Sequence, residues 1–141
     1  MDEKHGTVHL EEIGQIALTV ADLEESKTFY RDVLGMKFLF DAGTMAFFQC
    51  GSVRLLIGAA DPGAEKPAAG TNKTILYFRV RDIESVNGQL KEKGVQFVQE
   101  PHLVARMKSH DLWLAAFEDP SGNTLELMSE KTRNAGEEKS A

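Results

Sequence analysis

Two residues in the C-terminal half, His110 and Glu126, are suited to acid–base chemistry. An imidazole titrates near neutral pH, so a histidine oriented by a carboxylate can act as a general base. The same imidazole could instead only hydrogen-bond a ligand, or be a solvated loop residue without a function. His110 directly precedes an apolar segment, 112–118, which favours a position at the rim of a sheet. We take Glu126 and His110 as the candidate catalytic residues.

Four further side chains are suited to holding a flat or anionic ligand. Arg54 and Arg79 each offer a planar, permanently charged fork for a carboxylate or enolate oxygen, although either could instead pair with Glu126 as a structural ion pair. Tyr77 and Trp113 are aromatic walls on which a ligand could stack, or ordinary core residues. We expect all four to be ligand-binding residues.

The elements that must position these side chains occur twice, in residues 13–58 and 73–129. Each copy begins with a short strand and continues into a helix that starts at an aspartate, Asp22 or Asp82, which can cap free amide groups. Each helix should end at a glycine, Gly35 or Gly94, where a positive φ costs little. Two copies are too few for a solenoid, so we expect a paired, closed domain.

Three strands follow each of these glycines, so each copy is a βαβββ module. The predicted strands are 36–40, 46–50 and 53–57 in the first copy, and 95–99, 112–118 and 124–128 in the second. The segment 101–110, which contains His102 and His110, is predicted to be a loop over a cavity mouth. We expect one domain over 11–130, with module 1 at 11–58, a linker at 59–72, module 2 at 73–130, and flexible tails at 1–10 and 131–141.

Alternation along the strands predicts which residues face a shared interior, because successive side chains point to opposite faces of a sheet. Apolar residues at alternate positions should pack on the helices. The residues left to line the interior are Gln15, Ala17, Thr19, Arg54, Leu56, Ile75, Tyr77, Arg79, Thr124, Glu126 and Met128. Of these, we expect Gln15, Leu56 and Ile75 to be ligand-binding residues as well. The direction of Trp113 stays open, because its strand is apolar on both faces.

Composition narrows the class of protein. The chain has 141 residues, of which 42% are hydrophobic, enough to build one core without disulfides. A net charge of -6 and the lack of a basic run argue against DNA or RNA as a partner. The single cysteine, Cys50, suits a reducing cytoplasm, and no apolar stretch is long enough to span a membrane. We expect a cytoplasmic protein.

Three segments carry a resemblance to a known family: residues 16–23 (IALTVADL), 29–36 (FYRDVLGM) and 117–127 (FEDPSGNTLEL). The chain resembles the vicinal oxygen chelate superfamily, which includes glyoxalase I, bleomycin-resistance proteins, fosfomycin-resistance enzymes and extradiol dioxygenases. The resemblance covers residues 13–129. It implies an α+β fold in which two βαβββ modules form a cup-shaped mixed sheet, with the helices outside and a site within.

The resemblance also implies where a metal would bind. Metal-using members place a ligand, usually His, Gln or Glu, at four inward positions, two from each module. Here those positions hold Gln15, Leu56, Ile75 and Glu126. Leucine and isoleucine have no donor atoms, whereas divalent ions take four to six donors. We therefore predict no cofactor, with a weakly held divalent Zn, Ni, Mn or Fe ion as the alternative.

Two functions remain open. The first is a metal-independent protein that encloses a small organic ligand, as the bleomycin-resistance branch of the superfamily does. The alternative is a divalent-metal-dependent lyase or isomerase of the glyoxalase type, or a dioxygenase, acting on a substrate with vicinal oxygens. By resemblance we expect a homodimer. The cup could be completed within one chain or by exchange between two.

Overall fold

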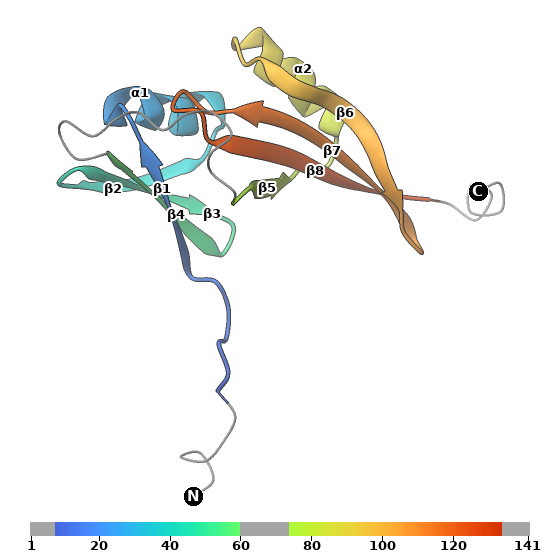
Figure 1. The fold of residues 1–141 in the computed structure, drawn as a ribbon, viewed down its shortest axis with the longest axis horizontal. Coiled ribbons are helices and arrows are strands. Elements are labelled where there is room, and N and C mark those ends of the chain that lie inside the picture. Colours follow the sequence, from blue (N-terminus) through green and yellow to red (C-terminus); the bar gives the residue numbers. More distant parts are fainter. Residues whose placement is uncertain (1–7, 60–73, 134–141) are drawn as a thin grey trace, which may run out of the picture.

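The computed structural model describes residues 8–59 and 74–133. These form two four-stranded mixed sheets, with α1 over one sheet and α2 over the other (Figure 1). The first module contains β1 (Gln15–Val20), α1 (Leu23–Thr28), η2 (Phe29–Val33), β2 (Lys37–Ala42), β3 (Met45–Cys50) and β4 (Val53–Ala59). The second contains β5 (Leu76–Arg79), α2 (Ile83–Glu92), β6 (Phe97–Arg106), β7 (His110–Glu118) and β8 (Thr124–Thr132). Almost all of the predicted linker lies outside the described residues.

Both modules have the same topology. The strand orders are β1-β4-β3-β2 and β5-β8-β7-β6. The first strand of each module pairs in parallel with the last, and the remaining pairs are antiparallel. The predicted α+β fold with two βαβββ modules is therefore confirmed. No helix among the described residues is long and apolar enough to cross a membrane.

Local capping signals place both helices as predicted. The side chain of Asp22 accepts a hydrogen bond from the backbone N–H of Glu25 at 3.0 Å, and that of Asp82 accepts from Ser85 at 3.1 Å. Gly35 and Gly94 have φ values of 74° and 93°, which favour glycine. These residues fix the direction in which each helix leaves its sheet.

The first helix changes its winding where it meets the second module. Its last five residues, η2, form a π-helical turn, and the N–H of Leu34 donates to the carbonyl of Phe29 at 2.9 Å. π-helical turns are rare in proteins. Within this turn Tyr30 is fully buried, and the ring of Phe29 lies 6.5 Å from that of Phe117 in β7. The turn therefore supplies the aromatic contacts between the modules.

The faces of the strands follow the predicted alternation. In β1, Leu18 and Val20 are buried, whereas Gln15 and its alternate neighbours are exposed. In β4 and β8 the helix-facing residues are likewise buried: Leu55, Ile57, Leu125 and Leu127. These residues join those of the helices in one core that spans both modules. The opposite face of each sheet, which carries no helix, is called the open face below.

The predicted loop at 101–110 is wrong. β6 continues to Arg106 and β7 begins at His110, so most of the segment is a long hairpin. β6 is an edge strand, where Pro101 is tolerated because its missing N–H breaks no inner ladder. The register shifts three times along β6. Such bulges interrupt the alternation of side chains between the two faces. The sequence of this segment therefore lacks the alternating pattern that predicts a strand.

The predicted C-terminal tail also begins too early, because β8 continues to Thr132. Beyond it, the guanidinium of Arg133 pairs with the carboxylate of Asp111 and donates to the carbonyl of Lys108 at 3.1 Å. Arg133 therefore ties the end of β8 to the β6–β7 hairpin.

The turn at residues 119–123 of the second module makes several hydrogen bonds with the first. Asp119 accepts a hydrogen bond of 2.7 Å from the buried hydroxyl of Tyr30. The hydroxyl of Ser121 accepts from the N–H of Ala21 at 2.8 Å, and the side-chain amide of Asn123 donates to the carbonyl of Thr19 at 3.1 Å. Burial and the charge of Asp119 raise the pKa of Tyr30, so the phenol stays a donor.

Candidate functional site

Glu126 lies on the open face of the second sheet, where only 8% of its surface is exposed. β5 runs beside β8 and places Tyr77 directly opposite it. Burial raises the pKa of Glu126 above its usual value, and the electrostatic interaction with His102 and a hydrogen bond with Tyr77 oppose part of that rise. Glu126 therefore keeps its proton to a higher pH than an exposed glutamate does.

The histidine near Glu126 is His102, not His110. In β6, His102 pairs with Leu114 of β7. Two residues farther along β7, on the same face, Ala116 pairs with Glu126 of β8. Its Nδ1 lies 2.8 Å from the carbonyl oxygen of Glu100. A carbonyl can only accept, so in the neutral ring Nδ1 carries the hydrogen and Nε2 keeps its lone pair. His102, rather than His110, therefore offers a hydrogen-bond acceptor on the face of Glu126.

His110 lies too far along the sheet to assist Glu126. It pairs with Thr132, whereas Glu126 pairs with Ala116 six residues away along β7, a separation of roughly 20 Å at the usual strand rise. Its Nε2 lies 2.9 Å from a carboxylate oxygen of Glu130. The predicted catalytic pairing of His110 with Glu126 within one chain is therefore wrong.

Trp113 lies on the opposite face from Glu126. Its partner across the ladder is Ser129, whose hydroxyl donates to the carbonyl of Arg81 on the helix side. The indole packs against the core, and Nζ of Lys131 lies 4.3 Å from the ring centroid. The direction of Trp113, which the sequence leaves open, is therefore toward the helix side, and of the two alternatives core packing holds rather than ligand binding on the open face.

Neither arginine pairs with Glu126. Arg54 Nε donates to the side-chain oxygen of Gln15 at 2.8 Å, and the guanidinium of Arg79 lies 3.3 Å from Glu130. The guanidinium carbon of Arg54 also lies 5.5 Å from the centroid of the Phe47 ring, which stacks on Phe40 at 4.5 Å. The open face of the first sheet is therefore largely aromatic and apolar, whereas that of the second carries the carboxyl and imidazole groups.

The positions at which the superfamily holds a metal offer few donors. Leu56 and Ile75 are half-buried hydrocarbon side chains, and the amide oxygen of Gln15 already accepts from Arg54. Within residues 8–59 and 74–133 no group of three or more His, Cys, Asp or Glu residues could hold a metal ion. The residues present do not fit a tightly bound divalent ion.

A pocket of about 520 Å³ lies between the two sheets, where the free edge of β5 faces the turn between β3 and β4. Three of the predicted ligand-binding residues line it: Ile75, Tyr77 and Arg79. Ile16 and Val53 contribute apolar walls from the first module. We call this the seam pocket. Through Tyr77 it adjoins Glu126 and the open face of the second sheet.

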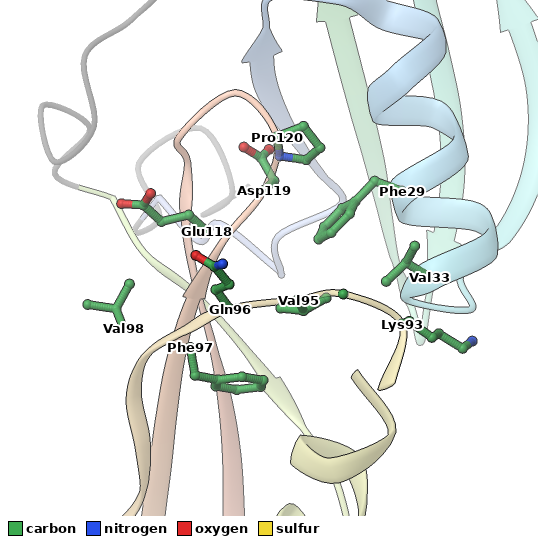
Figure 2. A pocket seen from close by; sticks show the side chains of 11 residues that line it. Phe29, Val33, Lys93, Val95, Gln96, Phe97, Val98, Glu118, Asp119 and Pro120 are labelled. Carbon is green, nitrogen blue, oxygen red and sulfur yellow. The ribbon is translucent and has the colours of Figure 1, made fainter. Parts of the chain in front are cut away.

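A second groove, of about 460 Å³, lies between η2 and the segment that joins α2 to β6. Figure 2 shows the ring of Phe29 directed into it and the side chain of Lys93 directed away. Asp119 at its edge accepts from Tyr30, from the N–H groups of Ser121 and Asn123, and from the Asn123 amide. Its carboxylate is thus fully engaged in holding the turn.

Replacing Glu126 with glutamine should change how stability depends on pH. The folded-state pKa is raised above the ordinary value of 4.5, so between these values the folded protein holds a proton that the unfolded chain releases. Wild-type stability should therefore fall as pH rises through this window. Glu126→Gln cannot ionise and should lack this fall. Urea unfolding between about pH 4 and pH 7 measures the difference.

The matched control is Glu25→Gln, at an exposed position, which should keep the wild-type profile. Tyr77→Phe removes a hydrogen bond that lowers the pKa of Glu126, so it should extend the fall to higher pH. Identical pH profiles for wild type and Glu126→Gln would contradict the assignment.

Known proteins agree with this architecture. The family model for the Glyoxalase/Bleomycin resistance protein/Dioxygenase superfamily matches residues 12–127. A probable lactoylglutathione lyase of Synechocystis is 32% identical over 120 residues, covering 79% of this chain and 89% of that protein. The glutathione transferase FosA of Serratia marcescens is 25% identical over 120 residues, covering 84% of this chain and 80% of that protein.

Solved structures show the same fold. A putative glyoxalase family protein from Bacillus anthracis superposes with a TM-score of 0.71 at 21% identity, covering 89% of this chain and all of that one (100%). With the family match over most of its length, the chain belongs to the glyoxalase/bleomycin resistance protein/dioxygenase superfamily.

Proposed function

We propose that the protein binds a small organic molecule on the open face of the second sheet and in the adjoining seam pocket, without a metal ion. The observation that carries this proposal is the pair of hydrocarbon side chains, Leu56 and Ile75, at two of the four positions where metal-using relatives place ligands. The engaged amide of Gln15 supports it, because a side chain held by Arg54 would have to be released before it could coordinate.

The polar groups around Glu126 support recognition of an oxygen-bearing ligand. The carboxyl group of Glu126 can accept a hydrogen bond, and can also donate one in its protonated form, and Nε2 of a neutral His102 can accept another. Tyr77, which is 48% exposed, can present the edge or face of its ring to a flat group. A pocket with apolar walls and few polar groups is the usual form of a small-molecule site.

A metal-dependent reaction of the glyoxalase type is the second candidate. Two observations favour it: His102 brings an imidazole lone pair near Glu126, and the relatives named above are a probable lactoylglutathione lyase and a glutathione transferase. Two protein donors would hold an ion weakly, since structural and catalytic sites use at least three.

Metal content separates the two candidates. The purified protein should contain less than stoichiometric metal, and Zn²⁺, Ni²⁺, Mn²⁺ or Fe²⁺ should leave its melting temperature unchanged. Elemental analysis and thermal unfolding with each ion test this. Tight uptake of one ion per chain would reverse the order of the two candidates.

A gain-of-function variant serves as the control. Leu56→Glu combined with Ile75→His installs donors at the two hydrocarbon positions and should create metal-dependent stabilisation. Leu56→Met combined with Ile75→Leu, which changes the same positions without adding a strong donor, should not.

We also propose a cytoplasmic homodimer. The open faces expose large apolar side chains, among them Phe40 at 46% and Met45 at 36%, and patches of this kind mark interaction surfaces. Light scattering at micromolar concentration should give twice the 15.6 kDa mass of one chain. A mass of 15.6 kDa would contradict the dimer.

A further inference from the structure

An apolar cavity of about 190 Å³ lies between the two modules, on the helix side of the sheets. Leu34, Met36 and Cys50 line it from the first module, and Phe78, Val86 and Leu127 from the second. The space is partly open to solvent, so its hydrocarbon lining is in contact with water. An apolar ligand that covered this lining would remove hydrocarbon surface from water, which is favourable.

The lining of the cavity determines what it can hold. Apart from the thiol of Cys50, the six side chains named above are hydrocarbon or thioether groups. Arg79 also borders it, but its guanidinium lies 3.3 Å from Glu130. Water against this lining gains few hydrogen bonds from the protein, so an apolar molecule that displaces it gives up little.

The cavity has a neighbour through which a ligand could enter. Cys50, Phe78 and Arg79 line both this cavity and the larger seam pocket. These three residues thus form the boundary between the two spaces. Cys50 as a residue is half-buried, and the alkylation rate of its thiol reports on this boundary.

We infer that this cavity is a binding site for a compact apolar molecule, or for the compact apolar group of a larger one, about the size of a single six-membered ring. The side chains that carry the site are distinct from Glu126 and its partners, so the inference stands independently of the proposed function. A ligand bound there contacts both modules and therefore stabilises their packing.

Benzene is the probe for this inference. At saturating concentration it should raise the midpoint of thermal unfolding by on the order of 3 °C, because it binds only the folded protein. It should also slow alkylation of Cys50, the single cysteine of the chain. At five times its dissociation constant, the slowing should be about sixfold if the bound ring blocks the thiol.

Val86→Phe fills the cavity and should abolish both effects, whereas Val98→Phe makes the same change at a position that is 65% exposed and should keep them. The wild-type alkylation experiment does not depend on the folding of either variant. If benzene neither raises the midpoint nor protects Cys50 in the wild-type protein, the inference is overturned. It is equally overturned if a folded Val86→Phe variant responds like the wild type.

Discussion

Replacing Asp119 with alanine should lower the free energy of unfolding by about 3 to 5 kcal/mol, because it strands several buried donors at once. Asp119 is only 4% exposed. Its carboxylate accepts from the Tyr30 hydroxyl, from two backbone N–H groups and from the side-chain amide of Asn123. Urea unfolding followed by circular dichroism measures the loss.

Two further variants show how much of this loss comes from the buried hydrogen bonds. Tyr30→Phe removes one of the four hydrogen bonds and should cost about 1.5 to 3 kcal/mol, the range for a hydrogen bond to a charged group. Asp41→Ala removes an exposed carboxylate that pairs with Lys27 at 3.1 Å, and should cost less than about 1 kcal/mol. A loss of under 1 kcal/mol for Asp119→Ala would show that the turn does not couple the modules.

The importance of Asp119 could not be predicted from the sequence. The sequence shows residues 119–122 as a turn with proline and glycine in favourable places. The hydrogen bond from Tyr30 spans 89 positions along the chain, and no local pattern indicates such a contact. The repeat predicts two similar modules. The hydrogen bonds between the modules are not part of the repeated pattern, so the repeat does not predict them.

Local signals, by contrast, predicted the modules well. The caps at Asp22 and Asp82 and the glycines at 35 and 94 act within one turn of helix, so their effect is fixed by neighbouring residues. Strand faces were predicted wherever the ladder is regular, as for Leu55 and Ile57 in β4. In a regular strand, the alternation of side chains with a period of two residues is enough to predict the face on which each residue lies.

The site was predicted less well because β6 is irregular. Three register shifts bring His102 to the face of Glu126, although its position in the sequence suggested a loop. The direction of Trp113 could not be read because its neighbours are apolar on both faces of the sheet. Its pairing with Ser129 decides the face, and pairing is a property of the folded chain. A weak signal for His102 is present, since no glycine separates its segment from the predicted strand 95–99, which the structure extends through it as β6.

Replacing Phe117 with alanine should lower the free energy of unfolding by about 3 to 5 kcal/mol, the usual cost of removing a buried phenylalanine ring. Phe117 is fully buried, and its ring centroid lies 5.3 Å from that of Phe97 and 6.5 Å from that of Phe29. The ring also lines the apolar cavity. Its loss should therefore enlarge an existing space rather than create a separate one. Urea unfolding measures the cost.

Val98→Ala also truncates an apolar side chain, but in the edge strand β6, at a position that is 65% exposed. Because little buried surface is lost there, this control should cost less than about 1.5 kcal/mol. Benzene provides a second readout: it should raise the melting temperature of Phe117→Ala by more than that of the wild type, because the enlarged cavity has more apolar surface to cover. Equal losses for the two alanine variants would contradict the placement of Phe117 in the core between the modules.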